Sequence, residues 1–175
     1  LKPLRHMDYF GALMILLVGF GWARPVEVDA RYFRKPKRDM AIVAFAGPFS
    51  NIIIAFISSL LGNGTAVLIH YFFNSGYLFY LFQILLYIFY FITVINVSLA
   101  VFNLIPIPPL DGSKILAAFL PERIYYKIMR YERFLYMGLI ILIFAGSNFS
   151  RVLGNTVGYI VEFLYDLTFL PFSFL

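Results

Sequence analysis

Two long apolar stretches, residues 40–61 and 77–103, restrict what this chain can fold into more than any other feature. Each is long enough to cross the hydrocarbon core of a bilayer as a helix, which takes about 20 residues. Of all residues, 62% are hydrophobic and only 13% are charged, which is far from the composition of a soluble domain. We therefore expect an integral membrane protein built from helices.

The order of apolar segments predicts an all-α, polytopic helical bundle that forms a single membrane domain over residues 1–175. The expected spans are residues 40–61, 77–103, 134–149 and 152–172. Residues 10–22 are too short to cross as a helix, so we expect a short re-entrant or interfacial segment there. Residues 25–29 follow it and alternate as a short β-strand does. The run Gly62-Asn63-Gly64 is expected to end the first span.

The basic residues are unevenly distributed. Eleven of the fourteen Lys and Arg residues lie in two segments, 24–38 and 114–133, which flank apolar stretches. Both segments should therefore face the cytoplasm. The net charge of +5 is explained by this topology, so we expect no nucleic-acid partner. The chain has no cysteine, which excludes disulfides and thiolate metal ligands.

A proline-rich decamer, Asn103-Leu104-Ile105-Pro106-Ile107-Pro108-Pro109-Leu110-Asp111-Gly112, ends the second long apolar stretch. Its prolines lack a backbone N–H and disfavour helix in the residues before them, so the helix should end near Asn103 and the chain should continue extended. Asp111 is the only acid between Met40 and Pro121. A carboxylate in such a place is costly to desolvate, so a cation, a metal or a water cavity should lie beside it. An ordinary Asp-Gly turn is the simpler alternative.

The decamer resembles the Asn-x-x-Pro-x-x-x-Leu-Asp-Gly signature of the site-2 protease family, which are membrane-embedded zinc metallopeptidases, and it is most similar to the short bacterial and archaeal members. Three further stretches resemble family segments in the same order: residues 1–11, Gly21-Trp22-Ala23-Arg24-Pro25-Val26 and Ala46-Gly47-Pro48-Phe49-Ser50-Asn51. The family's His-Glu-x-x-His helix, which supplies two metal ligands and the general base, would lie before residue 1. We therefore expect the chain to be the C-terminal portion of such a protease and to be inactive alone.

The resemblance implies an intramembrane zinc metalloprotease that hydrolyses peptide bonds in transmembrane segments of other membrane proteins. It also implies one Zn²⁺ as cofactor, the lipid bilayer and a transmembrane protein substrate as partners, and a prokaryotic plasma membrane as location. The two basic segments place the active site towards the cytoplasmic side. A non-catalytic membrane scaffold or binding protein of the same fold is the alternative. An unrelated small transporter subunit is disfavoured because acids are so few between Met40 and Pro121.

Asp111 is the candidate metal ligand, flanked by Leu110 and Gly112. Asn103 is the candidate contact to an unwound substrate backbone or a developing oxyanion, since its amide offers donors and an acceptor; capping the carbonyls freed by the prolines is the alternative. The extended backbone from Pro106 to Leu110 is a candidate guide for the substrate.

Three other polar features receive lesser roles. Asn51 is expected to form a hydrogen bond between helices rather than to take part in chemistry. His6 is expected to support the site or the structure, and His70 should lie on the opposite side of the membrane, roughly 30 Å from Asp111. Glu162 and Asp166 share one helical face, and face either a polar interior or the membrane interface.

Overall fold

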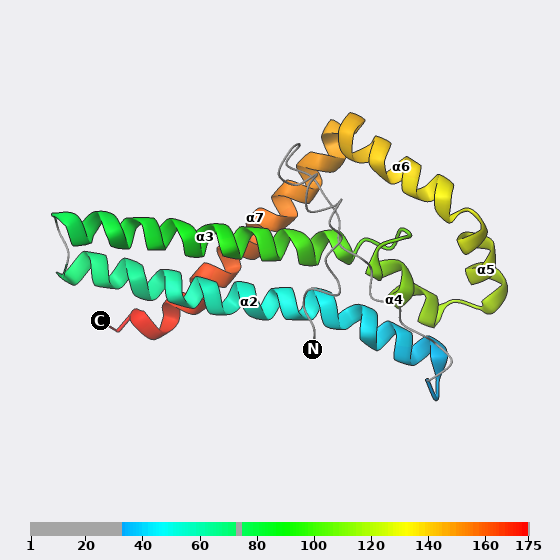
Figure 1. Ribbon diagram of the computed structural model, residues 1–175, viewed down its shortest axis with the longest axis horizontal. Coiled ribbons are helices and arrows are strands. Elements are labelled where there is room, and N and C mark those ends of the chain that lie inside the picture. The colour runs from blue at the N-terminus through cyan, green and yellow to red at the C-terminus, as the bar shows by residue number, and fades with distance from the viewer. Residues whose placement is uncertain (1–32, 73–74, 175) are drawn as a thin grey trace, which may run out of the picture. The chain divides into compact units, whose positions relative to one another are not determined.

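The computed structural model describes residues 33–72 and 75–174, and the chain divides into two units, Leu1–Pro36 and Lys37–Leu175. Within the described part the second unit is helical and holds no strand (Figure 1). Its elements are α2 (Pro36–Phe72), α3 (Tyr77–Asn103), α4 (Asp111–Phe119), α5 (Glu122–Arg130), α6 (Glu132–Ala145), α7 (Ser147–Phe169) and the 3₁₀ turn η3 (Leu170–Phe172). The re-entrant and strand-like segments expected within residues 10–29 lie outside this part.

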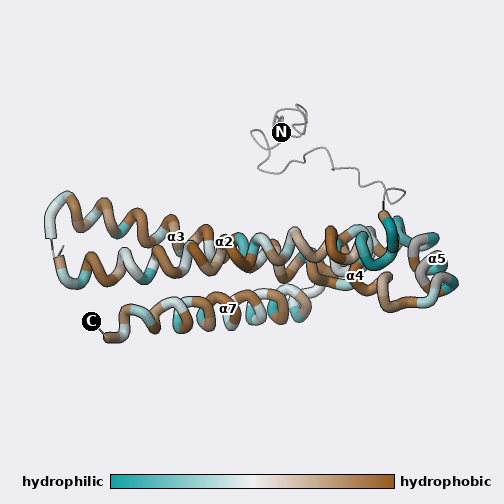
Figure 2. The backbone as a smooth tube through the Cα atoms, turned by 90° about the horizontal axis from the view of Figure 1, so that it is seen from below, coloured by the Kyte–Doolittle hydropathy of each residue, from teal (hydrophilic) through white to brown (hydrophobic). Residues whose placement is uncertain are grey.

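Two of these helices are long and apolar enough to cross a membrane, which confirms the expectation of an all-α membrane protein. They are α2 with 37 residues and α3 with 27, and many of their large apolar side chains are exposed. The backbone of the apolar residues is brown in Figure 2. Helix α6 has 14 residues and is too short to cross alone. Together with α7 it can make one further crossing, with a bend of 82° between Glu132–Ile143 and Ser147–Phe172. The division of the sequence into four spans stays a prediction.

Helix α2 does not end at Gly62, so that expectation was wrong. The helix continues to Phe72 because Gly62 and Asn63 are buried against α7. The Asn63 amide Nδ2 donates to the backbone oxygen of Tyr165 at 2.8 Å and to Oγ1 of Thr168 at 2.9 Å. A Cβ on Gly62 would lie 3.0 Å from the Tyr165 hydroxyl. The glycine therefore serves close packing between helices.

Helices α2, α3 and α7 enclose the core of this unit. Ala55, Val97, Val161 and Leu164 form its apolar centre, and hydroxyl side chains join the helices around it. Ser58 Oγ on α2 donates to the backbone oxygen of Phe89 on α3 at 2.9 Å. Figures 1 and 2 show α2 and α3 lying alongside one another with α7 packed against them. Small and hydroxyl-bearing residues allow this close approach in a membrane.

Helix α4 runs antiparallel along the first part of α2. The Nζ of Lys37 donates to the backbone oxygen of Leu120 at 3.5 Å. At the other end of α4, a Cβ placed on Gly47 would lie 3.6 Å from Oδ2 of Asp111. The two contacts are about 15 Å apart along α2 and about 14 Å apart along α4 at 1.5 Å per helical residue. The candidate metal ligand is therefore held beside Gly47.

Candidate metal centre

Helix α3 ends at Asn103, as the prolines predicted. Two of the last carbonyl groups are satisfied by the backbone, because Leu104 N–H donates to Ala100 O at 3.1 Å and Ile105 N–H donates to Phe102 O at 3.1 Å. The Asn103 side chain is half-buried and forms no hydrogen bond within the part of the chain that the structure describes. Capping these carbonyls therefore does not occupy the Asn103 amide.

The chain does not continue extended after Asn103, so that expectation was wrong. The N–H of Ile107 donates to the oxygen of Ile105 at 2.8 Å, and the N–H of Leu110 donates to the oxygen of Ile107 at 3.0 Å. The prolines forbid a continued helix. Ile107 keeps its backbone N–H, which closes one turn, and its backbone oxygen accepts the hydrogen bond of the next turn. The segment from Pro106 to Leu110 is thus folded upon itself and offers no straight backbone to guide a substrate.

Gly112 lies directly against the end of α3. It is buried, and a Cβ built on it would overlap the Leu104 carbonyl oxygen and come within 2.5 Å of the Ile105 carbonyl oxygen. These contacts are with backbone, which cannot move aside as a flexible side chain can. Only glycine fits here, and the close approach brings Asp111 next to the residues that follow Asn103.

We expect Gly112→Ala to destabilise the protein by about 3 kcal/mol, the upper range for an overpacked interior position. The measurement is thermal or denaturant unfolding in detergent. The matched control is Gly138→Ala in α6, where a Cβ meets nothing within 4 Å. That change should be neutral or stabilising by up to about 1 kcal/mol, since alanine favours helix. Equal stability of the two variants would contradict the tight contact at Gly112.

Asp111 is the first residue of α4, where the helix dipole favours a negative charge, and its side chain is 29% exposed. Its Oδ1 accepts a hydrogen bond from Lys114 Nζ at 2.9 Å. Its Oδ2 would lie 3.6 Å from a Cβ built on Gly47, and among the described residues no other atom beyond the neighbouring residues of α2 comes within 4 Å of that position. A cation, a metal or a water cavity was the expectation for this carboxylate, and among the described residues the structure shows a cation, the ammonium of Lys114.

Asp111 fits one ligand position of a zinc site. Zinc takes carboxylate oxygens as ligands, and Oδ2 accepts no hydrogen bond from the described residues. Residues 33–72 and 75–174 contain no group of three His, Cys, Asp or Glu side chains that could hold a metal. A complete set of ligands therefore needs residues beyond those described.

The structure brings the Ala46–Asn51 segment next to the Asp-Gly decamer. Gly47 of the Ala46–Asn51 segment faces Asp111, and Asn51 lies four residues later on the same side of α2. The hydrogen bond expected from Asn51 to another helix is not made to any described residue. Ser58 and Asn63 make such bonds instead.

The two histidines have different outcomes. His70 lies in the last turn of α2, which places it about 35 Å along the helix from Gly47 at 1.5 Å per residue. It is therefore no ligand partner of Asp111, as the sequence predicted. His6 lies outside the described residues, as do the segments 1–11 and Gly21–Val26.

Sequence reasoning missed Lys114 and the role of Gly47. The spacing of Asp111 and Lys114 is the i,i+3 spacing that brings opposite charges together on a helix, so Lys114 could have been found. The position of Gly47 next to Asp111 depends on how α4 packs on α2, for which the sequence gives no signal.

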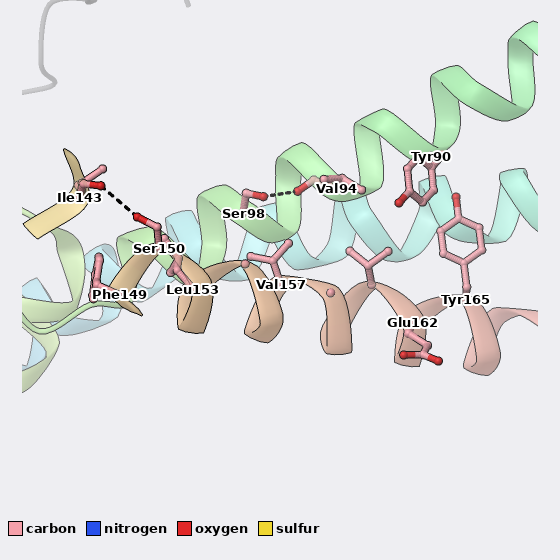
Figure 3. Close-up of a pocket in the computed structure, with 13 residues that line it drawn as sticks. Tyr90, Val94, Ser98, Ile143, Phe149, Ser150, Leu153, Val157, Glu162 and Tyr165 are labelled. Carbon is pink, nitrogen blue, oxygen red and sulfur yellow. Dashed lines mark hydrogen bonds between the residues drawn. The ribbon is translucent and has the colours of Figure 1, made fainter. Parts of the chain in front are cut away.

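A cavity of about 670 Å³ lies between α3, α6 and α7 (Figure 3). Two of its hydroxyl groups are engaged, since Ser98 donates to Val94 O at 2.7 Å and Ser150 donates to Ile143 O at 3.0 Å. The buried hydroxyl of Tyr165, which also lines the cavity, has no hydrogen-bond partner among the described residues. Glu162 contributes to the lining, but its carboxylate points away from α3 in Figure 3. Neither Asn103 nor Asp111 lines this cavity, so it is separate from the candidate metal centre.

The two membrane-length helices and the Asp-Gly segment that follows α3 are the features through which the sequence resembles the site-2 protease family. Residues 7–146 match the family model "Peptidase family M50", and the chain belongs to this family. The resemblance seen in the sequence is thereby confirmed.

A curated relative agrees with this assignment. The chain is 38% identical over 149 residues to the Bacillus subtilis (strain 168) protein named "Putative zinc metalloprotease YwhC". The match covers 81% of this chain and 63% of that protein, so the chain spans less than two thirds of the relative's length. No solved structure matches the chain.

Proposed function

We propose that this protein is an intramembrane zinc metalloprotease that hydrolyses peptide bonds in transmembrane segments of other membrane proteins. The observation that carries the proposal is the position of Asp111 beside Gly47 on α2. Gly47 lies about 10 Å along α2 from Met40, where the apolar stretch begins, at 1.5 Å per residue. In this proposal the carboxylate therefore lies about two helical turns inside the apolar stretch, where a transmembrane substrate helix can reach it.

Asp111 serves as one ligand of a single zinc ion in this proposal. When bound, the ion supplies a nucleophilic water at neutral pH and polarises the scissile carbonyl. The role of the described residues is to hold the Asp111 carboxylate at the N-terminal end of α4, with Oδ2 on the side of Gly47. The remaining ligands and the general base come from residues that the structure does not describe.

Asn103 contacts the substrate in this proposal. A transmembrane helix must be locally unwound before a peptide bond can be attacked, which leaves backbone groups that need partners. The half-buried Asn103 amide makes no hydrogen bond within the described residues and can donate to such a carbonyl or to the developing oxyanion. Gly112 supports this arrangement because its contact with Leu104 and Ile105 keeps Asp111 close to the end of α3.

The active site faces the cytoplasmic side in this proposal. Lys37 at the start of α2 contacts Leu120 at the end of α4, so one described residue of the first basic segment lies beside one residue of the second. A shared location is what the positive-inside rule requires of two cytoplasmic basic segments. The expected membrane is the plasma membrane of a prokaryote.

The proposal is tested with the full-length protein in sealed membrane vesicles that also contain a single-span substrate. We expect cleavage at a bond within the apolar segment of the substrate. A membrane-impermeant zinc chelator should stop cleavage in inside-out vesicles and leave it unchanged in right-side-out vesicles. Chelator-resistant cleavage would contradict the zinc mechanism, and inhibition only in right-side-out vesicles would reverse the orientation. Bound zinc without any cleavage would favour a non-catalytic scaffold.

A further inference from the structure

Within the part of the chain that the structure describes, Lys114 is the residue that forms an ion pair with Asp111. Its Nζ lies 2.9 Å from Oδ1 of Asp111, with the lysine side chain 46% exposed and the carboxylate 29% exposed. The two residues are one helical turn apart at the start of α4, a helix of nine residues. An exposed pair of this kind contributes little to folding stability, so its effect should be sought in the charge and orientation of the carboxylate.

The pair makes the two oxygens of Asp111 inequivalent. Oδ1 is engaged by Lys114, whereas Oδ2 is directed to the side of Gly47. A cation approaching Asp111 therefore finds one oxygen open and the other already bonded. The lysine ammonium also lies a few ångströms from any ion bound at Oδ2, and like charges at that distance repel one another.

We infer that Lys114 is a positioning residue that leaves only Oδ2 of Asp111 open to the metal and that lowers the affinity of the centre for zinc. The inference rests on the proposed function, since it needs Asp111 to be a zinc ligand. Removing the lysine frees Oδ1 for the metal and also removes the repulsion, so both consequences act in the same direction. The affinity for zinc should increase when the ammonium is lost.

The test measures zinc affinity of the full-length protein in detergent by competition with a chromophoric chelator. Lys114→Gln should bind zinc about threefold to tenfold more tightly, the range that one nearby charge at a partly exposed site supplies. Lys114→Met should do the same, and Lys114→Arg, which keeps the charge and the pairing, should retain the original affinity. The control is Lys127→Gln on the basic helix α5, an exposed lysine with the same change of net charge, which should leave affinity unchanged.

A merely structural role for Lys114 predicts the opposite sign, because loosening α4 would weaken metal binding. Unchanged or weakened binding in both Lys114→Gln and Lys114→Met would therefore overturn the inference. The double variant Asp111→Asn with Lys114→Gln should gain less affinity over Asp111→Asn than Lys114→Gln gains over the original protein, because only the repulsion, and not the occupied Oδ1, is then removed. If Asp111→Asn by itself leaves zinc affinity unchanged, the assignment of Asp111 as a zinc ligand is wrong. If Asp111→Asn weakens zinc binding while the Lys114 variants have no effect, only the inference about Lys114 is wrong.

Discussion

Asp111→Asn in the full-length protein is expected to lower zinc affinity by at least ~10²-fold, the upper range reported for outer partners of metal ligands, and to abolish cleavage. Asparagine keeps the size of the side chain but removes the negative charge that binds the dication. Because the side chain is partly exposed and its pair with Lys114 is a surface pair, the fold should persist. Zinc content after a mild chelator wash and cleavage of a transmembrane substrate are measured on the same preparation.

The matched control for this variant is Asp166→Asn on α7. It removes the same charge from an exposed carboxylate that makes no contact with Asp111, and it should change neither zinc content nor cleavage. Full zinc and full cleavage in Asp111→Asn would show that the Asp-Gly pair is only a turn. A loss of both in Asp166→Asn as well would point to a general effect of charge in the membrane.

The features that sequence predicted correctly are those that local physics decides. The apolar stretches around Ala55 and Val97 are long enough to cross a membrane, and this alone predicted α2 and α3. The end of α3 at Asn103 follows from prolines that cannot continue a helix.

The features that sequence could not predict depend on contacts between distant segments. The sequence predicts a helix end at Gly62 and Asn63, because Gly and Asn are common at the C-terminal ends of helices. Packing on α7 overrides this tendency. The turns around Ile107 depend on hydrogen bonds that a run of prolines neither requires nor excludes. The position of Asp111 next to Gly47 is set by the contact of α4 with α2.

For the candidate site, the sequence predicted residues of the decamer motif but not their spatial neighbours. The Asp-Gly decamer predicts Asp111 and Asn103 as site residues from the order of residue types, and their roles stay predictions; the family assignment confirms only the resemblance. The spatial arrangement added Gly47, Lys114 and the tight packing of Gly112. The contacts with Lys114 and Gly47 indicate which oxygen of Asp111 is open to a metal, and the packing of Gly112 explains why no larger residue can replace it.

Asn103→Ala is expected to separate chemistry from metal binding. If its amide donates to the oxyanion, cleavage should slow by something like ~10², as the loss of a single oxyanion donor does in other hydrolases, while zinc stays bound. The expectation follows from an amide that makes no hydrogen bond within the described residues, so its removal leaves no described partner unsatisfied. Single-turnover cleavage and zinc content are measured together.

Two controls decide how the result of Asn103→Ala is interpreted. Asn155→Ala removes an exposed amide from α7, and His70→Ala removes an exposed ring at the far end of α2; both should cleave at the original rate. A loss of zinc in Asn103→Ala would assign this residue to the metal rather than to the substrate. An unchanged rate with intact zinc would leave no role for Asn103 in the transition state, and the oxyanion donor would then have to be sought among residues outside the described part of the chain.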